Sequence, residues 1–270
     1  MFCHFLLAQL TQPAPKIYPP KSNQDLRTVW QKIASAAAPN YQKQALLYYL
    51  LKDCRQLTDI DSTFARKVFL PHKYQLLMMG LWELDHCQFS RALDHLTDPS
   101  LTPTFSDEIL YILFAHPKCD NSLAMAYYLT VSPPLQSPRT LDAYFSFLCQ
   151  TSVVEAYRFC RSHGYKHEEL FEKLIVSVLS GSPGDARAEN ALTLIGLPFS
   201  EEEEKWFEEC LLYGKGAKCR EAKDSVMMRR IALGKNIEGV GALDRLRGHK
   251  INGVNWDDVR LSMQRTTATA

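Results

Sequence analysis

Residues 64–110, FARKVFLPHKYQLLMMGLWELDHCQFSRALDHLTDPSLTPTFSDEIL, decide the fold class. In this stretch short amphipathic segments follow one another, and residues that end or start helices recur about every ten to twenty positions. The pattern predicts short helices joined by short turns. The segments carry apolar positions but none of the residue clusters that catalysis needs, which favours a scaffold over an enzyme.

The apolar spacing is typical of helices that bury one face. Four groups of residues stand at positions i, i+3, i+4 and i+7, so that each group forms one stripe along a helix. They are Tyr74, Leu77, Met78 and Leu81; Phe89, Ala92, Leu93 and Leu96; Leu141, Tyr144, Phe145 and Leu148; and Val153, Ala156, Tyr157 and Cys160. By contrast, residues 41–51, YQKQALLYYLL, are apolar nearly all round after Gln44, which predicts a helix enclosed by its neighbours.

Signals for strands are nearly absent, because no stretch alternates apolar and polar residues over the length of a strand. The sequence therefore predicts an all-α fold, an irregular solenoid-like array of short antiparallel helices. We expect three regions along the chain. Residues 1–21 form an extended Pro-rich arm, residues 22–235 form one helical domain, and residues 236–270 form a flexible or partly helical tail.

Four serines mark expected helix starts, because a serine side chain accepts hydrogen bonds from the first backbone N–H groups of a helix. They are Ser22, Ser106, Ser152 and Ser200. The last two each have a glutamate three positions later, which predicts a capping box.

Composition indicates a globular protein in a reducing compartment. Hydrophobic residues make up 46% of the chain and charged residues 23%, with a formal net charge of +1. The eight cysteines never form a C-x-x-C pair. No run approaches the roughly 20 apolar residues of a membrane span.

Two histidine clusters are candidate chemical sites, and neither is complete. His163 and His167 have the i, i+4 spacing of zinc ligands, but Gly164 between them weakens the helix that this spacing requires, and no further ligand follows. His86 and Cys87 suggest a Cys/His pair, yet nothing identifies a third, orienting group. We therefore expect no metal, no cofactor and no catalysis.

Charge is unevenly distributed along the chain. Residues 201–209 hold six glutamates and one lysine, whereas residues 215–235 hold seven basic and two acidic residues. Glutamates in an opening helical turn complement the helix dipole. The basic block is either a solvated helix face or a contact for an acidic partner or a nucleic acid.

Eight stretches, in this order along the chain, resemble the fungal form of the ELYS family of nuclear pore assembly proteins. They are YPPKSNQDL (18–26), ALLYYLLKD (45–53), FLPHKYQLLMMGLWELD (69–85), FSRALDHLTDPSLTPTFSDEIL (89–110), LAMAYYLTVSPPL (123–135), TSVVEAYRFCR (151–161), LPFSEEEEKWFEECL (197–211) and AKDSVMMRRIALGK (222–235). Each block alone is little more than a helix pattern, and the combination is specific.

The resemblance implies an α-helical nucleoporin-type domain that joins the Y-shaped scaffold complex of the nuclear pore. The implied partners are the largest helical scaffold subunit of that complex and its small WD-repeat subunit, with no cofactor and no small-molecule substrate. Animal relatives also carry a β-propeller and AT-hooks that engage chromatin. We expect neither here, because few residues precede the helices and Arg247-Gly248-His249 lacks the second arginine of an AT-hook.

Exposed aromatic and basic side chains on the rigid helices are the expected contacts with a partner. The candidates are Phe69, Tyr74, Trp206, Phe207, Lys218, Lys223, Arg229 and Arg230. The aromatic residues also fit a helix core, and the basic residues also fit a solvated face. Two other functions stay open: nucleic-acid or chromatin binding through residues 215–235, and a helical adaptor unrelated to pores.

Overall fold

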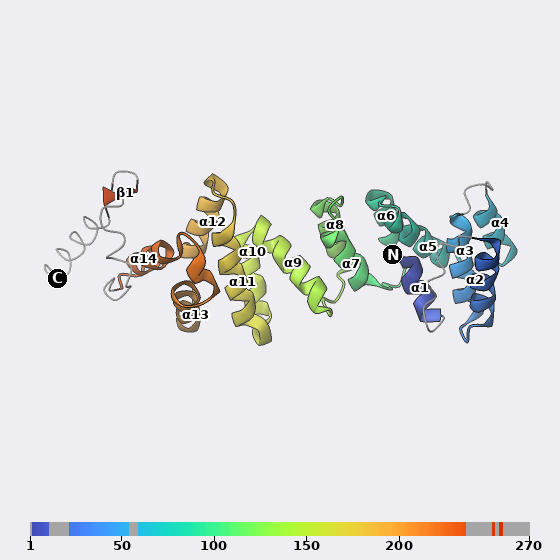
Figure 1. The fold of residues 1–270 in the computed structure, drawn as a ribbon, viewed down its shortest axis with the longest axis horizontal. Helices are drawn as coiled ribbons and strands as arrows, with labels where there is room; N and C mark the ends of the chain where they lie inside the picture. Colours follow the sequence, from blue (N-terminus) through green and yellow to red (C-terminus); the bar gives the residue numbers. More distant parts are fainter. Residues whose placement is uncertain (1, 11–21, 54–58, 236–249, 252–253, 256–270) are drawn as a thin grey trace. The chain divides into compact units, whose positions relative to one another are not determined.

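The computed structural model of the chain describes residues 2–10, 22–53, 59–235, 250–251 and 254–255. In these ranges the chain forms fourteen α-helices, so the prediction of an all-α helical array is confirmed (Figure 1). The chain divides into two compact units between Ala143 and Tyr144, within a helix. The sequence pattern marks no boundary at this position.

Unit 1 contains α1 to α8 and the first turns of α9. The helices are α1 (Phe2–Leu10), α2 (Asn23–Ser35), α3 (Asn40–Lys52), α4 (Ile60–Lys67), α5 (His72–Asp85), α6 (Phe89–Leu96), α7 (Ser106–Ala115), α8 (Asn121–Val131) and α9 (Pro138–Thr151). The first turn of α9 is fixed to α7, because the Thr140 hydroxyl donates to the Asp107 carboxylate at 2.9 Å.

Unit 2 contains the rest of α9 and five further α-helices. These are α10 (Val153–Ser162), α11 (His167–Ser180), α12 (Asp185–Gly196), α13 (Glu201–Leu212) and α14 (Ala222–Ala232), with short 3₁₀ turns η1 (Gly164–Lys166) and η2 (Lys215–Lys218). Two short strands, β1 (Lys250–Ile251) and β2 (Val254–Asn255), pair in antiparallel register. The other residues of the expected tail, 236–270, lie outside the described ranges.

The predicted apolar stripes form the core. In three of the four groups, those that begin at Phe89, Leu141 and Val153, every side chain is buried. Helix α3 is enclosed as predicted, because it packs against α1, α2, α4 and α5. Five of the six side chains from Ala45 to Leu50 are buried. Helical periodicity in the sequence therefore located most of the packing.

Three of the four predicted helix starts are correct. Ser22, Ser152 and Ser200 each accept a hydrogen bond from the N–H of the third helical residue, and Ser200 with Glu203 completes the capping box. Ser106 is not a cap. It is the first residue of α7, and Phe105 occupies the cap position with a left-handed backbone at φ 58°.

The predicted extended arm over residues 1–21 is wrong at its start. Residues 2–10 form α1, which lies beside α5 (Figure 1) and buries Phe2, Cys3, Leu6 and Leu7 in unit 1. The four prolines further along favoured an extended segment, but the first ten residues have enough apolar side chains to bury one helical face. The proline-rich residues 11–21 lie outside the described ranges.

The closest helix pair depends on a glycine. A Cβ atom at Gly80 on α5 would lie 2.5 Å from Cγ of Leu96 and 3.2 Å from the carbonyl oxygen of Ala92, both on α6. Real Cβ atoms do not approach other atoms this closely, so glycine allows α5 and α6 to pack at this distance.

We expect Gly80→Ala to lower the free energy of unfolding of unit 1 by about 1–3 kcal/mol, because overpacking outweighs the gain in helix propensity. In a Leu96→Ala background the added methyl group has room, so the same substitution should be neutral or stabilising. Urea denaturation of the four proteins in this cycle measures the coupling. An equal loss in both backgrounds would show that the contact with Leu96 does not matter.

Candidate protein-docking surface

Unit 1 contains a groove with a volume of about 620 Å³. It is lined by Leu6 of α1, by Tyr41, Gln42, Ala45 and Leu46 of α3, by Tyr74, Leu77 and Met78 of α5, and by Thr104 and Phe105 before α7. None of these side chains is charged. The groove therefore offers apolar and aromatic surface of the kind that protein and small-molecule sites share.

Two stacked tyrosines form one end of the groove. The rings of Tyr41 and Tyr74, in the first turns of α3 and α5, have centroids 5.1 Å apart and an interplanar angle of 29°. The ammonium group of Lys73 lies 5.3 Å from the centroid of the Tyr74 ring. Tyr74 was predicted as a partner contact, and Tyr41 was not, because a pair 33 positions apart leaves no local pattern.

A half-buried carboxylate holds the three helices that form the groove. Asp85, the last residue of α5, accepts hydrogen bonds from the backbone N–H groups of Phe2 at 2.9 Å and Cys3 at 3.1 Å. It also accepts a 2.7 Å hydrogen bond from the Tyr49 hydroxyl on α3. Asp85 thus serves as the N-terminal cap of α1 from 82 to 83 positions away.

These contacts change the acidity of both partners. Burial by itself would raise the pKa of Asp85, but hydrogen bonds at the start of α1 and from Tyr49 outweigh it and lower the pKa below its ordinary value. Burial, together with the Asp85 charge, raises the pKa of Tyr49. Asp85 is therefore a carboxylate and Tyr49 a neutral hydroxyl at neutral pH.

Phe69 stands in the turn between α4 and α5. Its side chain is 89% exposed, and its backbone is left-handed at φ 52°. It is not among the residues that line the groove, although it lies only three positions before α5 begins. Left-handed backbone favours glycine and asparagine, and an exposed site favours polar residues. Folding of unit 1 accounts for neither feature of this phenylalanine.

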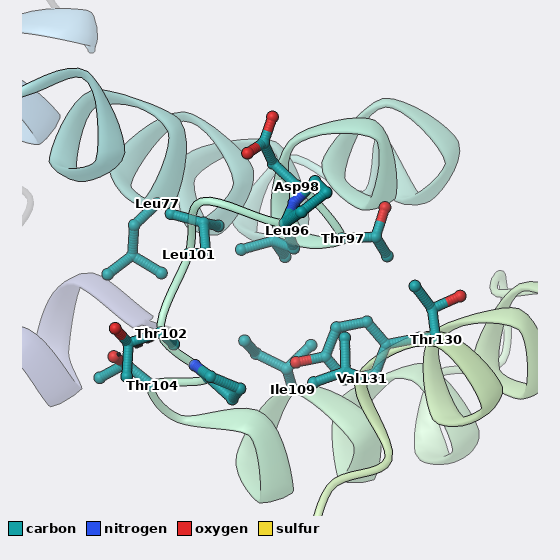
Figure 2. Close-up of a pocket in the computed structure, with 13 residues that line it drawn as sticks. Leu77, Leu96, Thr97, Asp98, Leu101, Thr102, Thr104, Ile109, Thr130 and Val131 are labelled. Atoms are coloured by element: carbon teal, nitrogen blue, oxygen red, sulfur yellow. Dashed lines mark hydrogen bonds between the residues drawn. The ribbon is translucent and has the colours of Figure 1, made fainter.

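A second cavity, of about 140 Å³, shares Leu77 and Thr104 with the groove. Figure 2 shows its lining from α5, α6, α8 and the connection before α7, with the carboxylate of Asp98 turned away from Ile109 and Val131. Asp98 accepts hydrogen bonds from the hydroxyl and N–H groups of Ser100, which lower its pKa. No nucleophile or acid–base pair points into this space, so it carries no chemistry.

Of the two aromatic residues of unit 2 that were predicted as partner contacts, Trp206 is partly exposed and Phe207 lies in the core. Trp206 is half-buried and packs edge-on against His167 at a centroid distance of 5.2 Å. Phe207 is fully buried, with its ring 5.4 Å from that of Phe199. Phe207 as a partner contact is therefore corrected: on α13 the helical period turns it into the core, where a partner cannot reach it.

The acidic and basic blocks pair with each other. Arg229 on α14, 6% exposed, donates to the Glu204 carboxylate on α13 at 2.5 and 3.0 Å and to the carbonyl oxygens of Ile195 and Leu197. Arg230 forms a two-bond pair with Glu208 at 2.6 and 2.7 Å, which lowers the pKa of Glu208. Arg229 as a partner contact is corrected, because its guanidinium is buried and fully used.

The two predicted lysines are available to solvent to different degrees. Lys218 in η2 is exposed, and Lys223 in α14 is half-buried. Within the described part of the chain, no ion pair joins either lysine to a carboxylate. Lys215 nearby is paired with Glu172 at 2.9 Å. The basic block therefore presents fewer unpaired cations than its composition suggests.

His163 and His167, the two histidines with the spacing of zinc ligands, do not meet in the structure. His163 ends α10 and bonds to the Phe159 carbonyl oxygen at 3.0 Å, whereas His167 lies 2.9 Å from the carboxylate of Glu203. Glu203 is fully buried and also accepts hydrogen bonds from Tyr157 at 2.9 Å and from the Ser200 N–H at 2.6 Å. Its pKa is lowered because these bonds outweigh burial. This cluster fixes α10, α11 and α13 together.

Among the described residues, no group of three or more His, Cys, Asp or Glu side chains could hold a metal ion. None of the described helices has the length and apolar character needed to cross a membrane. Cys87 is exposed and lies 3.7 Å from Nε2 of His116, a residue that the sequence pattern did not connect with it.

The sequence matches the model of a protein family described as ELYS, nuclear pore complex assembly, over residues 2–214. The chain belongs to the ELYS family. The matched residues include all of unit 1, with its groove and Phe69, and extend through α13. The description of this family is nuclear pore complex assembly.

The chain is also similar to a fission yeast protein. It is 30% identical over 187 residues to the "Uncharacterized protein ely5" of Schizosaccharomyces pombe. The alignment covers 69% of this chain and 59% of the relative, so the chain spans less than two thirds of the length of the protein that it matches.

We expect Asp85→Asn to detach α1 and to lower the free energy of unfolding by about 1.5–3 kcal/mol, the usual contribution of hydrogen bonds to a charged group. Because the pKa of Asp85 is lower in the folded protein, this stabilisation is complete above the unfolded value of about 3.9 and is lost as the pH falls through the folded value. Hydrogen exchange should accelerate in residues 2–10. Asp94→Asn, at an exposed carboxylate on α6, is the control.

Arg229→Met should lower the free energy of unfolding of unit 2 by about 3–5 kcal/mol, because Glu204 and two carbonyl oxygens lose their partner in a buried site. Arg230→Met should cost at most about 1 kcal/mol, since its pair with Glu208 is more exposed. Thermal unfolding followed by circular dichroism compares the two. Equal losses would contradict the difference in burial.

Proposed function

We propose that this chain is a non-enzymatic structural nucleoporin that docks on the Y-shaped scaffold complex of the nuclear pore and contributes to pore assembly at the nuclear envelope. The proposed partners are the largest helical scaffold subunit of that complex and its small WD-repeat subunit. The membership of the ELYS family, whose description is nuclear pore complex assembly, supports the general role. The choice of complex and subunits is the proposal.

The exposed ring of Phe69 is the observation that best supports a docking role. A phenylalanine in a left-handed turn, with most of its ring in water, stabilises the folded chain neither by burial nor by backbone preference. A large aromatic side chain that folding does not use is typical of a binding hot spot. The stretch that begins at Phe69 is also one of the blocks that resemble the ELYS family.

The helices around Phe69 are well suited to present it. Leu70, the next residue, is buried, and its carbonyl oxygen accepts a 2.7 Å hydrogen bond from the side chain of Gln75. The turn is therefore fixed on the first turns of α5. A side chain on a fixed turn loses little conformational entropy when a partner binds, which raises affinity without further contacts.

Three of the seven basic residues in 215–235 form ion pairs within the chain, which weakens the case for nucleic-acid binding through this block. Arg229, Arg230 and Lys215 are engaged by Glu204, Glu208 and Glu172. Charge reversal at the two arginines would disturb unit 2, so it cannot serve to separate the two functions. Lys218→Glu with Lys223→Glu is the appropriate variant for a nucleic-acid assay.

We expect the purified chain to co-elute with the reconstituted Y complex in size-exclusion chromatography, and Phe69→Asn to weaken this association at least about tenfold, as loss of a hot spot does. Asparagine tolerates the left-handed backbone, so the variant should fold normally. Tyr213→Asn, at an 85% exposed aromatic residue of unit 2, is the matched control and should change little.

Absence of co-elution by the unaltered chain would overturn the proposal and favour an adaptor unrelated to pores. Equal effects of the two substitutions would retain the Y complex as partner but remove Phe69 from the interface. Crosslink mapping of the complex identifies the helical face that docks.

A further inference from the structure

We infer that the groove between α1, α3 and α5 receives an acidic segment of a partner protein, anchored by an aromatic or aliphatic side chain. This inference rests on the proposed docking function and names the chemistry of its partner. It has two supports: the charges that surround the groove, and the shape and apolar lining of the groove itself.

The first support is that positively charged residues lie at the starts of α3 and α5, where the helix dipole favours negative charge. α3 and α5 run in the same direction, because Tyr41 stacks on Tyr74 in their first turns and Tyr49 bonds to Asp85 in their last. Their positive N-terminal ends therefore lie together at the tyrosine end of the groove. Neither helix has an acidic residue in its first turn or a side-chain cap, and Pro39 and Pro71 occupy the cap positions.

Cations stand where anions would stabilise these helices. His72 and Lys73 open α5. Lys43 lies in the first turn of α3, where its ammonium group donates a 2.9 Å hydrogen bond to the carbonyl oxygen of Ala34. Arg66 and Lys67, both exposed, end α4 just before Phe69. Within the described part of the chain, none of these side chains forms an ion pair with a carboxylate. Asp98 is an acidic group that interacts with His72. Hydrogen bonds from Ser100 lower the pKa of Asp98 most, and the charge of His72 lowers it further.

Other helices of the same chain show the usual arrangement. α2 begins with a Ser22 cap and an aspartate in its first turn, and α13 begins with a Ser200 cap and four glutamates. α6 also begins without a side-chain cap or an acidic residue in its first turn. What distinguishes α3 and α5 is that their two uncapped starts lie together, at the stacked tyrosines. An acidic partner segment would supply to both helix ends the negative charge that the chain itself does not place there.

The second support is the groove's apolar lining. Ala45, Leu46 and Met78 line it together with the two tyrosines. A concave apolar lining fits a side chain from a helix or extended peptide, as in helix-in-groove recognition. Single-stranded nucleic acid instead needs exposed aromatic faces on which successive bases stack. Here the rings of Tyr41 and Tyr74 stack on each other, so the lining favours a protein.

The test uses the full chain and two fluorescein-labelled synthetic peptides of about 18 residues, long enough for an amphipathic helix. Both carry Leu and Phe at the same i, i+3, i+4 and i+7 positions, and they differ only in having Glu or Lys at every other position. Fluorescence anisotropy at about 50 mM and about 200 mM salt gives their affinities. Labelled oligo(dT) of about 20 nucleotides is the nucleic-acid probe.

We expect the Glu peptide to bind at least about tenfold more tightly than the Lys peptide at the lower salt concentration, and the difference to shrink at the higher one. Lys73→Glu should weaken Glu-peptide binding about threefold to tenfold. Lys118→Glu, an exposed charge reversal in the turn between α7 and α8, is the matched control and should leave it unchanged. Tyr41→Ser, at a 41% exposed ring, should weaken both peptides alike.

Equal binding of the two peptides, binding of neither, or equal effects of Lys73→Glu and Lys118→Glu would overturn the inference. So would tighter binding of oligo(dT) that Lys73→Glu abolishes, since the surface would then take nucleic acid. Co-elution of the unaltered chain with the Y complex, measured alongside, separates the two claims. If it persists while peptide selectivity fails, only the groove inference falls; if it is absent, the proposed function falls whatever the peptides do.

Discussion

One half-buried carboxylate sets the geometry on which the groove of unit 1 depends. Asp85 accepts hydrogen bonds from Phe2 and Cys3, which begin α1, and from Tyr49 near the end of α3. The charge stands at the C-terminal end of its own helix, where the dipole disfavours an anion, and the positive N-terminal end of α1 offsets that cost. Three helices that are distant in sequence thereby acquire fixed relative positions, and the groove is the space that they leave between them.

Unit 2 is organised by charge in another way. Its acidic and basic blocks, which the sequence presents as two separate candidate surfaces, are largely the two halves of one internal contact between α13 and α14. Arg229 also satisfies backbone carbonyl oxygens that follow α12. A charge that bonds to carboxylate and backbone at once is difficult to replace, because each alternative leaves a buried polar group unpaired. Electrostatic pairing in this part of unit 2 therefore stabilises the fold.

Local patterns predicted what local physics determines. The spacing of residues 89–96 located a buried stripe, the all-round apolar residues 41–51 located the central helix, and Ser200 with Glu203 located a cap. What the sequence could not predict are contacts between distant positions: the capping of α1 by Asp85, the tyrosine stack of the groove, and the pairing of the charged blocks. The left-handed turn at Phe69 was also hidden, because it contains none of the glycine or asparagine residues that usually mark such a conformation.

Phe69, in the turn before α5, and Gly80, within α5, are constrained in different ways. Gly80 is confined by what lies inside the molecule, since any side chain there meets α6. The ring of Phe69 meets almost nothing of its own chain. Substitutions at position 80 should therefore alter folding, whereas substitutions at position 69 should leave the fold intact and alter only the proposed docking. The helical frame and the proposed contact, eleven positions apart, can thus be changed independently.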